Sequence, residues 1–391
     1  MNILILTHLY PTPEGYGIPP DTKVIHYYAK DFQKMGHRVQ VVLMNHWPVK
    51  ELFRHDLRTL FVREADYEME GVPVHLFCYQ LLTPRKRHPE SWQAGIINRR
   101  LAALVARLGW KPDRVLVNFP TFCVGVDQIF KLDCLSMGVF HISDVYNLRL
   151  DSSRKVRAFL DRFSNWGCRN QQIGQFLSET MGRDAVPIYS GIDASLIAPR
   201  EQIEEKCEKM PDPLRLLFAG KLIARKRAAD LVKAVQGLEI PVSLTIVGDG
   251  PEMARLRAQA GKDPRICFTG ALSREETVAR MGEADAFAMV STGETFGLVY
   301  LEAMGQGCIP IASRGEGMDG ILEDGVQGFL VQPGEIEQIR SVLRTIYALS
   351  QASRRQMILR SYELACSMTS MQMSQRYLDA SGEERNGGSS A

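Results

Sequence analysis

The stretch "DAFAMVSTGETFGLVYLEAMGQGCIPIAS" (residues 285–313) decides the fold, because two hydrophobic patterns alternate within it. The apolar runs at 285–291 and 308–313 are short and continuous, which is typical of strands buried on both faces of a parallel sheet. Between them, a segment that starts near Gly297 and stops at one of two later glycines is typical of a helix. This order predicts a strand–helix–strand unit.

The same pattern extends over the chain of 391 residues, which is long for a single core and predicts two domains. A helix is expected after the first strand, with Asp21 as N-cap and Gly36 as C-cap. The charged stretch 201–213 ends in two prolines and predicts a linker. The remaining predicted strands are 3–8, 38–44, 72–79, 114–119, 139–143, 214–220, 242–248, 265–270 and 328–333.

We therefore predict an α/β protein with two doubly wound, Rossmann-like domains that face one another across a cleft. Residues 1–198 form the first domain and residues 199–361 the second. A C-terminal helix at about 362–382 is expected to pack back on the first domain. Residues 383–391 are polar and rich in Gly and Ser, which predicts a disordered tail.

Charge is distributed unevenly, although the net charge is only +2. Residues 1–200 hold 25 Lys and Arg against 19 Asp and Glu, with basic runs at 84–88 and 98–100. These runs are either solvated loops or a surface that attracts an anionic acceptor or membrane. No aromatic residues are interspersed in the manner of a nucleic-acid binder, so we expect no nucleic-acid partner.

The sequence favours a cytoplasmic location, with or without membrane association. The apolar N-terminus lacks a basic segment and a cleavage site, so it is interpreted as a first buried strand. No run approaches the roughly 18 apolar residues that span a bilayer. The eight cysteines are scattered without paired spacing, as is typical of reduced thiols.

Two glutamates, Glu294 and Glu302, lie on either side of the predicted helix start. The first-turn N–H groups of Phe296 to Val299 would be unpaired, and they suit an anion such as diphosphate. Glu302 would lie about 7–8 Å along the helix axis, so it could bind a ribose while Glu294 binds a sugar. The alternative is a capping glutamate followed by a surface glutamate.

A basic turn, "FAGKLIARKRAADLV" (218–232), follows the first strand of the second domain. Cations at a strand-to-helix turn can neutralise phosphates and stabilise a leaving diphosphate, although a solvated basic turn is the alternative. No Asp-x-Asp occurs in the chain, so we expect no metal site, no cofactor and metal-independent activity. The residues concerned are Gly220, Lys221, Arg225, Lys226 and Arg227.

These residues together resemble family 4 glycosyltransferases, which are retaining enzymes of the GT-B fold. The pair Glu294 and Glu302 resembles the E-x7-E motif of that family, and "GKLIARKR" resembles its phosphate loop. "YSGIDASLIAP" (189–199) and "IVGDGPE" (246–252) are similar to two further family segments. The resemblance covers nearly the whole chain and is most specific over 214–335.

The resemblance implies roles for several residues. Glu302 would bind the ribose, and Glu294 would contact the donor sugar with help from the backbone of the helix start. Lys226 would hold the diphosphate, with Lys221 in the position of a family arginine. The other implied donor contacts are the backbone at Phe296, Gly297 and Leu298, the base-packing Leu272, and Gly15 and Gly17 in the first loop.

The chain departs from the family pattern in places. Arg227 and Glu316 each replace a usual glycine. Many members carry His or Asp facing the sugar near the end of the fifth strand, where this chain has His141 and Asp144. Asp144 is preferred because "SDVYN" resembles a segment of some members, whereas His141 is alternatively a buried core histidine.

The resemblance thus implies a hexosyltransferase that moves a sugar from a UDP- or GDP-sugar to an acceptor hydroxyl with retention. The acceptor would be a sugar or lipid-linked glycan in cell-surface polysaccharide or glycolipid assembly. Alternatives are a sugar-nucleotide epimerase or hydrolase of the same fold, and a non-catalytic sugar-binding subunit. The implied catalytic residues are Glu294, Lys226, Asp144 and His141.

Overall fold

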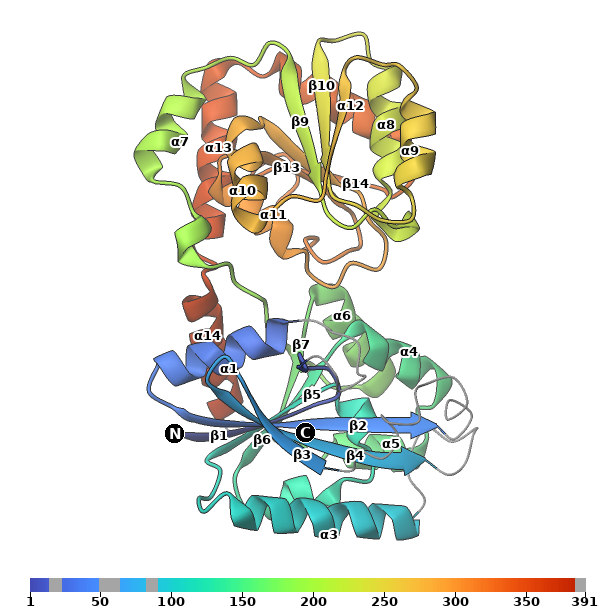
Figure 1. Cartoon of the computed structure of the whole chain (residues 1–391), viewed down its shortest axis with the longest axis vertical. Coiled ribbons are helices and arrows are strands. Elements are labelled where there is room, and N and C mark those ends of the chain that lie inside the picture. The colour runs from blue at the N-terminus through green and yellow to red at the C-terminus, as the bar shows by residue number, and fades with distance from the viewer. Residues whose placement is uncertain (14–22, 49–63, 82–90, 384–391) are drawn as a thin grey trace, which may run out of the picture. The chain divides into compact units, whose positions relative to one another are not determined.

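The computed structural model describes residues 1–13, 23–48, 64–81 and 91–383, which form two compact units (Figure 1). The first unit comprises Met1–Arg169, Ile173–Ile188 and the chain from Ser374 onward. The second comprises Asn170–Gln172 and Tyr189–Met373. Each unit contains one sheet covered by helices on both faces, so the predicted α/β class with two doubly wound sheets is confirmed.

The sheet of the first unit has the strand order β3-β4-β2-β1-β5-β6-β7-β8. All neighbours pair in parallel except β3 and β4, which are antiparallel. The strands are β1 (Asn2–Thr7), β2 (Arg38–Pro48), β3 (Glu64–Met69), β4 (Val72–Leu81), β5 (Arg114–Asn118), β6 (Leu135–Phe140), β7 (Asn165–Cys168) and β8 (Val186–Pro187).

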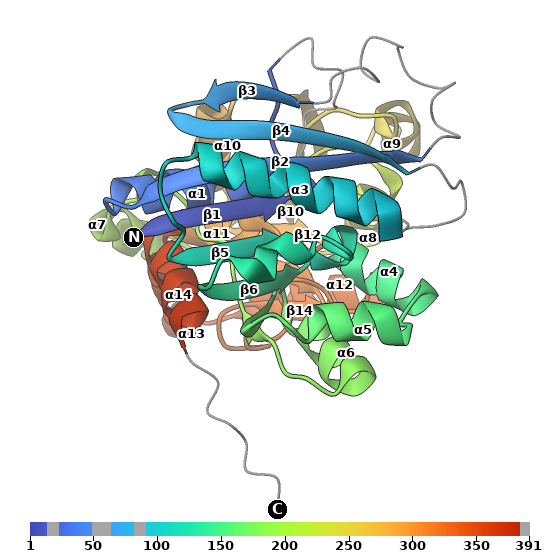
Figure 2. The same cartoon turned by 90° about the horizontal axis from the view of Figure 1, so that it is seen from below.

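Alternate side chains of β1 enter two hydrophobic clusters, one on each face of this sheet. Ile3 packs with residues of α1 (Val24–Lys34), whereas Leu4 packs with residues of α3 (Ser91–Arg107). Figures 1 and 2 show these two helices on opposite faces. The other helices of the unit are α4 (Ile142–Leu150), α5 (Arg154–Leu160), α6 (Gln171–Met181), α14 (Ser370–Gly382) and the 3-10 helices η2 (Pro120–Cys123) and η3 (Asp127–Lys131).

The sheet of the second unit is entirely parallel, with the strand order β11-β10-β9-β12-β13-β14. Its order reverses next to β9, so the carboxyl ends of β9 and β12 flank a topological switch point. The strands are β9 (Leu214–Ala219), β10 (Val242–Val247), β11 (Ile266–Gly270), β12 (Ala286–Met289), β13 (Ile309–Ser313) and β14 (Phe329–Val331).

Helices cover both faces of this second sheet. In Figure 1, α8, α9 and α12 lie on one side and α10, α11 and α13 on the other. The helices are α7 (Arg200–Cys207), α8 (Ala228–Gln236), α9 (Met253–Ala260), α10 (Arg274–Glu283), α11 (Leu298–Gly305), α12 (Ile336–Ala348), α13 (Gln351–Cys366) and the 3-10 helices η4 (Ala194–Leu196) and η5 (Ala224–Lys226).

The boundary between the units lies after Ile188, whereas the sequence analysis placed it after residue 198. Backbone hydrogen bonds tie the intervening segment to the second unit. The Ile192 N–H donates to the Met368 carbonyl at 3.0 Å, and the Ala198 N–H donates to the Gly305 carbonyl at 3.0 Å. Because such bonds join residues far apart in sequence, composition alone did not reveal them.

Three expectations for local structure were wrong. The predicted linker at 201–213 contains α7, which buries Ile203 and Cys207. The single C-terminal helix is two helices, α13 and α14, separated at residues 367–369. The predicted strand 139–143 is shifted, since β6 ends at Phe140 and α4 follows at once.

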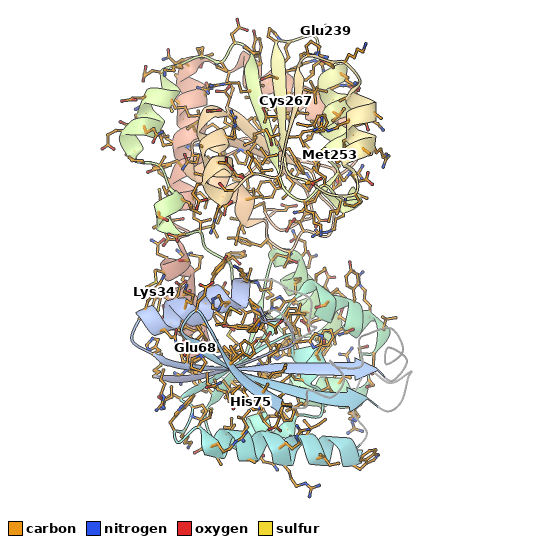
Figure 3. The ribbon with its side chains drawn as sticks, viewed as in Figure 1. Lys34, Glu68, His75, Glu239, Met253 and Cys267 are labelled. Atoms are coloured by element: carbon orange, nitrogen blue, oxygen red, sulfur yellow. The ribbon has the colours of Figure 1, made fainter. Side chains whose placement is uncertain are left out.

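The edge strand β3 was also not anticipated, because its side chains alternate between exposed and half-buried. It pairs with β4, and the buried His75 of β4 is hydrogen-bonded through Nδ1 to the Asp66 carboxylate of β3. Figure 3 labels His75 of β4 and Glu68 of β3, which lies opposite Pro73. Asp21, the expected cap of α1, lies outside the described residues, and Gly36 follows that helix with a φ of +82°.

No helix in the described part of the chain combines the length and the hydrophobicity needed to cross a bilayer.

Candidate active site

The turn between β12 and α11 is fixed by its own residues. Gly297 is the N-cap of α11 and has a left-handed φ of +85°. A Cβ atom there would lie 2.7 Å from the ring of Tyr300, so only glycine fits without movement. The Tyr300 hydroxyl in turn donates to the Met289 carbonyl at the end of β12. The helix start is therefore anchored to the sheet, near the predicted position.

The first N–H groups of α11 have no hydrogen-bond acceptor among the described residues. In the described residues, no acceptor is found for the backbone N–H of Gly297, Leu298 or Val299. Leu298 and Val299 are half-buried and pack against the core of the unit. These donors and the positive end of the helix suit an anion, as the sequence predicted.

Lys226 and Glu294 form an ion pair, although 68 positions separate them in sequence. Each side chain is only 14% exposed. Lys226 belongs to η5 after β9, and the neighbouring Arg225 lies 3.8 Å from the Glu294 carboxylate. The Arg225 carbonyl also accepts from the Thr292 N–H at 2.8 Å. The basic turn and the turn before α11 therefore form one structure.

Arg227 adopts the conformation usually reserved for glycine. Its φ is +53°, and it is the N-cap of α8. The Arg227 guanidinium donates to Asp230 at 2.6 Å, so the side chain points back onto its own helix. The other two residues singled out in this turn are Lys221, which is exposed, and Gly220, whose N–H donates to the Val247 carbonyl at 3.0 Å.

Glu302 is paired with Arg274, at 2.7 Å between Oε1 and Nη2. Glu302 is 15% exposed, whereas Arg274 is 44% exposed and lies at the start of α10. Leu272, the predicted base contact, immediately precedes the Ser273 cap of this helix and packs partly against the core. The sequence singled out Glu302 and Leu272 but gave no signal for Arg274.

In the first unit, Asp144 caps the helix α4. Its carboxylate accepts from the His141 N–H at 2.8 Å, and from the N–H and the hydroxyl of Thr121 at 3.0 and 2.5 Å. The side chain is fully buried, and burial raises the pKa of Asp144 to about 7. A direct contact with a sugar would require this helix start to move, so the geometry favours a structural role.

His141 is also enclosed. Its Nε2 lies 3.1 Å from the Asn118 Oδ1, and its ring stacks on Phe119 with centroids 3.8 Å apart. Burial, and then the nearby Arg169 charge, hold the pKa of His141 well below its usual value, so the ring is neutral. This arrangement is compatible with the core-histidine alternative, and sugar contact by His141 or Asp144 stays a prediction.

Two other predicted residues, Gly15 and Gly17, lie outside the described residues. The described part of the chain contains no group of His, Cys, Asp and Glu side chains that could hold a metal ion. The second unit thus brings together Lys226 with Glu294 and provides the free helix start of α11. It also contains Glu316, whose carboxylate contacts the turn before α11 and which the sequence marked only as a departure from a pattern.

Comparison with known proteins places this geometry in context. Over 163 residues, 40% of this chain, the protein is 31% identical to sulfoquinovosyl transferase SQD2 of Arabidopsis thaliana, covering 32% of that relative. Over 239 residues, 58% of this chain, it is 25% identical to alpha-monoglucosyldiacylglycerol synthase of Streptococcus pneumoniae, covering 54% of it. The matches therefore span about a third to a half of the length of these curated relatives.

Solved structures share the fold over the full length. HepE of Anabaena in complex with UDP is similar with a TM-score of 0.69 and 19% identity, over 97% of this chain and 99% of HepE. A complex of HepE with UDP-glucose gives a TM-score of 0.64 and 18% identity, over 97% and 98%. The GT-B fold class predicted from the sequence is thereby confirmed. In sequence, a family model described as glycosyl transferases group 1 matches residues 199–363, within the unit that holds Lys226, Glu294 and Glu302.

Proposed function

We propose that the protein is a retaining glycosyltransferase that moves a sugar from a nucleotide diphosphosugar to an acceptor hydroxyl. The observation that carries the proposal is the helix start of α11, whose N–H donors find no acceptor in the described part of the chain and follow closely on Glu294, the partner of Lys226. An anion-binding end, a cation and a carboxylate are what a diphosphate joined to a sugar requires. The match to glycosyl transferases group 1 over the same residues supports this reading.

The donor would bind with its diphosphate at the start of α11. Glu302 would accept hydrogen bonds from the ribose hydroxyls, and Glu294 would accept them from the donor sugar. On donor binding, the Lys226 ammonium group, which is paired with the Glu294 carboxylate, would shift to lie between that carboxylate and the phosphate. The complexes of HepE with UDP and UDP-glucose support a uridine nucleotide as the first donor to test.

In the reaction, the bond between the anomeric carbon and the diphosphate oxygen breaks. The acceptor oxygen forms its new bond on the same face, and its proton passes to the departing phosphate oxygen, so atoms and charges balance. Lys226 and Arg225 would stabilise the negative charge that grows on the diphosphate. We propose that these cations and the helix end perform this task without a metal.

Replacing either member of the pair tests the proposal. Glu294→Ala and Lys226→Ala should each lower transfer by at least about 100-fold, because both groups contact the donor at the reacting centre. Turnover with UDP-glucose and GDP-mannose would be measured with and without acceptor sugars, and thermal unfolding would check folding. Glu323→Gln is the control, since Glu323 is exposed and distant in sequence from both turns. Near-normal transfer by either alanine variant would refute the proposal.

The same assay separates the alternatives. An epimerase or hydrolase would consume the donor with no acceptor present, whereas a transferase should require the acceptor. A non-catalytic sugar-binding subunit would bind a nucleotide sugar without turning it over under any acceptor condition.

We also propose that the first unit contacts anionic membranes and that the acceptor is a glycolipid or a lipid-linked glycan. Tyr146 and Leu150 are 53% and 67% exposed on α4, and the exposed cations Arg149, Arg154 and Lys155 adjoin them in sequence. Such a mixture of apolar and basic side chains suits an anionic lipid surface. The name of the relative alpha-monoglucosyldiacylglycerol synthase favours a lipid acceptor.

Sedimentation with vesicles tests this surface. Vesicles in which about one third of the lipid is phosphatidylglycerol have a strongly negative surface potential. The protein should bind them more than it binds neutral vesicles. The variant Leu150→Ser with Arg154→Ser should bind several-fold less at the same salt concentration. Equal binding of the variant and the wild type would remove this surface from consideration.

A further inference from the structure

Glu316 contacts the backbone next to Glu294, and the proposed function does not use it. It lies in the loop after β13, 22 positions beyond Glu294. Its Oε1 accepts from the Gly293 N–H at 2.9 Å, and its Oε2 accepts from the Glu294 N–H at 2.7 Å. One carboxylate therefore spans two successive backbone amides. Hydrogen bonds to an ionised carboxylate are about twice as strong as neutral ones.

A second contact joins the same two segments. The Gly317 N–H donates to the Glu294 carbonyl at 3.0 Å, so both backbone groups of Glu294 are held from the loop. A Cβ atom at Gly317 would lie 2.5 Å from the Cα of Phe296, which shows how closely the backbones approach. The loop therefore contacts Glu294 on both sides, through the Glu316 side chain at its N–H and through the Gly317 backbone at its carbonyl.

The loop that supplies these contacts is itself braced. The Gly315 N–H donates to Asp319 at 2.6 Å, and the Arg314 N–H donates to the Val331 carbonyl of β14 at 2.8 Å. Glu316 thus acts from a segment tied to the sheet rather than from a free loop. Because the N–H and the carbonyl of Glu294 are both held, the starting point of its side chain is fixed, and its carboxylate is paired with Lys226.

We propose that Glu316 is a positioning residue that sets the orientation of the Glu294 carboxylate for the donor sugar. This inference rests on the proposed function, in which Glu294 contacts that sugar. It accounts for a carboxylate at a place where the resembled pattern has glycine, because a glycine would leave both amides without this acceptor. Glu316 acts through Glu294 and not on the nucleotide.

The test compares nucleotides with and without the sugar. Dissociation constants would be measured by calorimetry for UDP and UDP-glucose, and for GDP and GDP-mannose. The variants are Glu316→Gly, Glu316→Gln and Glu294→Ala, with Glu323→Gln as the matched control. We compare the dissociation constant of the nucleotide sugar with that of the bare nucleotide, for the base that the wild type binds. Glu316→Gly should raise this ratio by about tenfold, because only the sugar contact is weakened. The affinity for the bare nucleotide should stay within about twofold.

A double variant shows whether Glu316 acts through Glu294. If it does, the double variant Glu294→Ala with Glu316→Gly should show the same ratio of nucleotide-sugar to nucleotide dissociation constants as Glu294→Ala alone. Additive losses would mean that Glu316 acts elsewhere and would overturn the inference.

Amide hydrogen exchange gives a readout that needs no ligand. In Glu316→Gly, exchange at Gly293 and Glu294 should accelerate by about tenfold or more, while the thermal midpoint stays close to that of Glu323→Gln. Unchanged exchange would refute the contact.

The two levels of failure are distinguishable. If Glu294→Ala loses discrimination for the sugar and Glu316→Gly does not, the positioning role falls while the proposed function stands. If the wild type binds none of the four nucleotides, the proposed function falls and takes the positioning role with it.

Discussion

The residues of the candidate site work in pairs that are distant in sequence. Lys226 and Glu294 share a half-buried environment, and Arg274 holds Glu302 from the start of α10. A carboxylate held by a cation presents its remaining lone pairs in a defined direction. The orientation of both glutamates is therefore determined by residues outside the segment that contains them.

Removing Arg274 should weaken nucleotide binding through Glu302. Arg274→Ala should raise the dissociation constant of UDP by up to about fivefold, since a partly exposed ion pair contributes at most about 1 kcal/mol. The effect should shrink with 2′,3′-dideoxy-UDP, which lacks the hydroxyls that Glu302 would bind. Arg280→Ala is the control, because Arg280 pairs with Glu283 on the same helix at 2.9 Å. An equal loss for both nucleotides would assign Arg274 to another contact.

Sequence reasoning found both members of the pair Lys226 and Glu294 but only one member, Glu302, of the second pair. Glu294, Glu302 and Lys226 stood out because they flank strand-to-helix turns, where the pattern itself predicts chemistry. Arg274 is one arginine in an exposed, highly charged segment, and nothing in such a segment indicates a partner on another helix. Ion pairing across elements depends on tertiary packing, which a single sequence does not report.

At the scale of the element, the start of α4 illustrates how a cap can resemble a functional residue. Asp144 and His141 flank the first turn, and the Asp144 carboxylate satisfies the His141 N–H and two donors of Thr121. An Asp three residues into a helix suits capping as well as catalysis. The sequence could locate this turn, but only burial distinguishes the two roles.

This cap should make stability depend on pH. Because burial raises the pKa of Asp144 from 3.8 to about 7, the folded protein binds more protons than the unfolded chain between these values. The contribution of Asp144 to the free energy of unfolding should therefore be largest below about pH 4 and decrease as the pH rises toward 7. Urea unfolding of the wild type and Asp144→Asn across pH 4–8 checks this. A difference between them that is independent of pH would contradict it.

The elements that the sequence missed share a physical cause. The strand β3 carries a polar pattern at a sheet edge, and α7 has only two buried side chains in a charged segment. The break between α13 and α14 occurs at Thr369, whose hydroxyl accepts from the Gln372 N–H at 3.4 Å and starts the second helix. The central strands, which are buried on both faces, were predicted well because burial dictates their composition.

At the scale of the molecule, each unit has its own core, and the second unit also has a buried polar anchor. In the second unit, Asp285 at the start of β12 binds Arg354 of α13 and Arg215 of β9, each at 2.9 Å. Arg354 and Asp285 are 0% and 1% exposed. This cluster connects two strands and a helix at the end of the sheet opposite to the candidate site.

Breaking this cluster should destabilise the second unit strongly. Asp285→Asn leaves the Arg354 charge buried without its counter-ion, which typically costs about 3–5 kcal/mol. Guanidinium unfolding should show the loss, whereas Asp263→Asn, at a more exposed pair with Arg265, should cost less than about 1 kcal/mol. Similar effects of the two substitutions would show that Asp285 is not an anchor.

The division of the first unit has a practical consequence for dissecting the molecule. Its core includes Tyr377 and Leu378 of α14, and Tyr377 packs edge-on against Tyr28 and Phe32 of α1. A fragment that stops at Ile188 would lack these side chains and would expose an apolar surface on α1. A foldable version should instead join residues 374–383 to the end of residues 1–188 through a short glycine-rich linker.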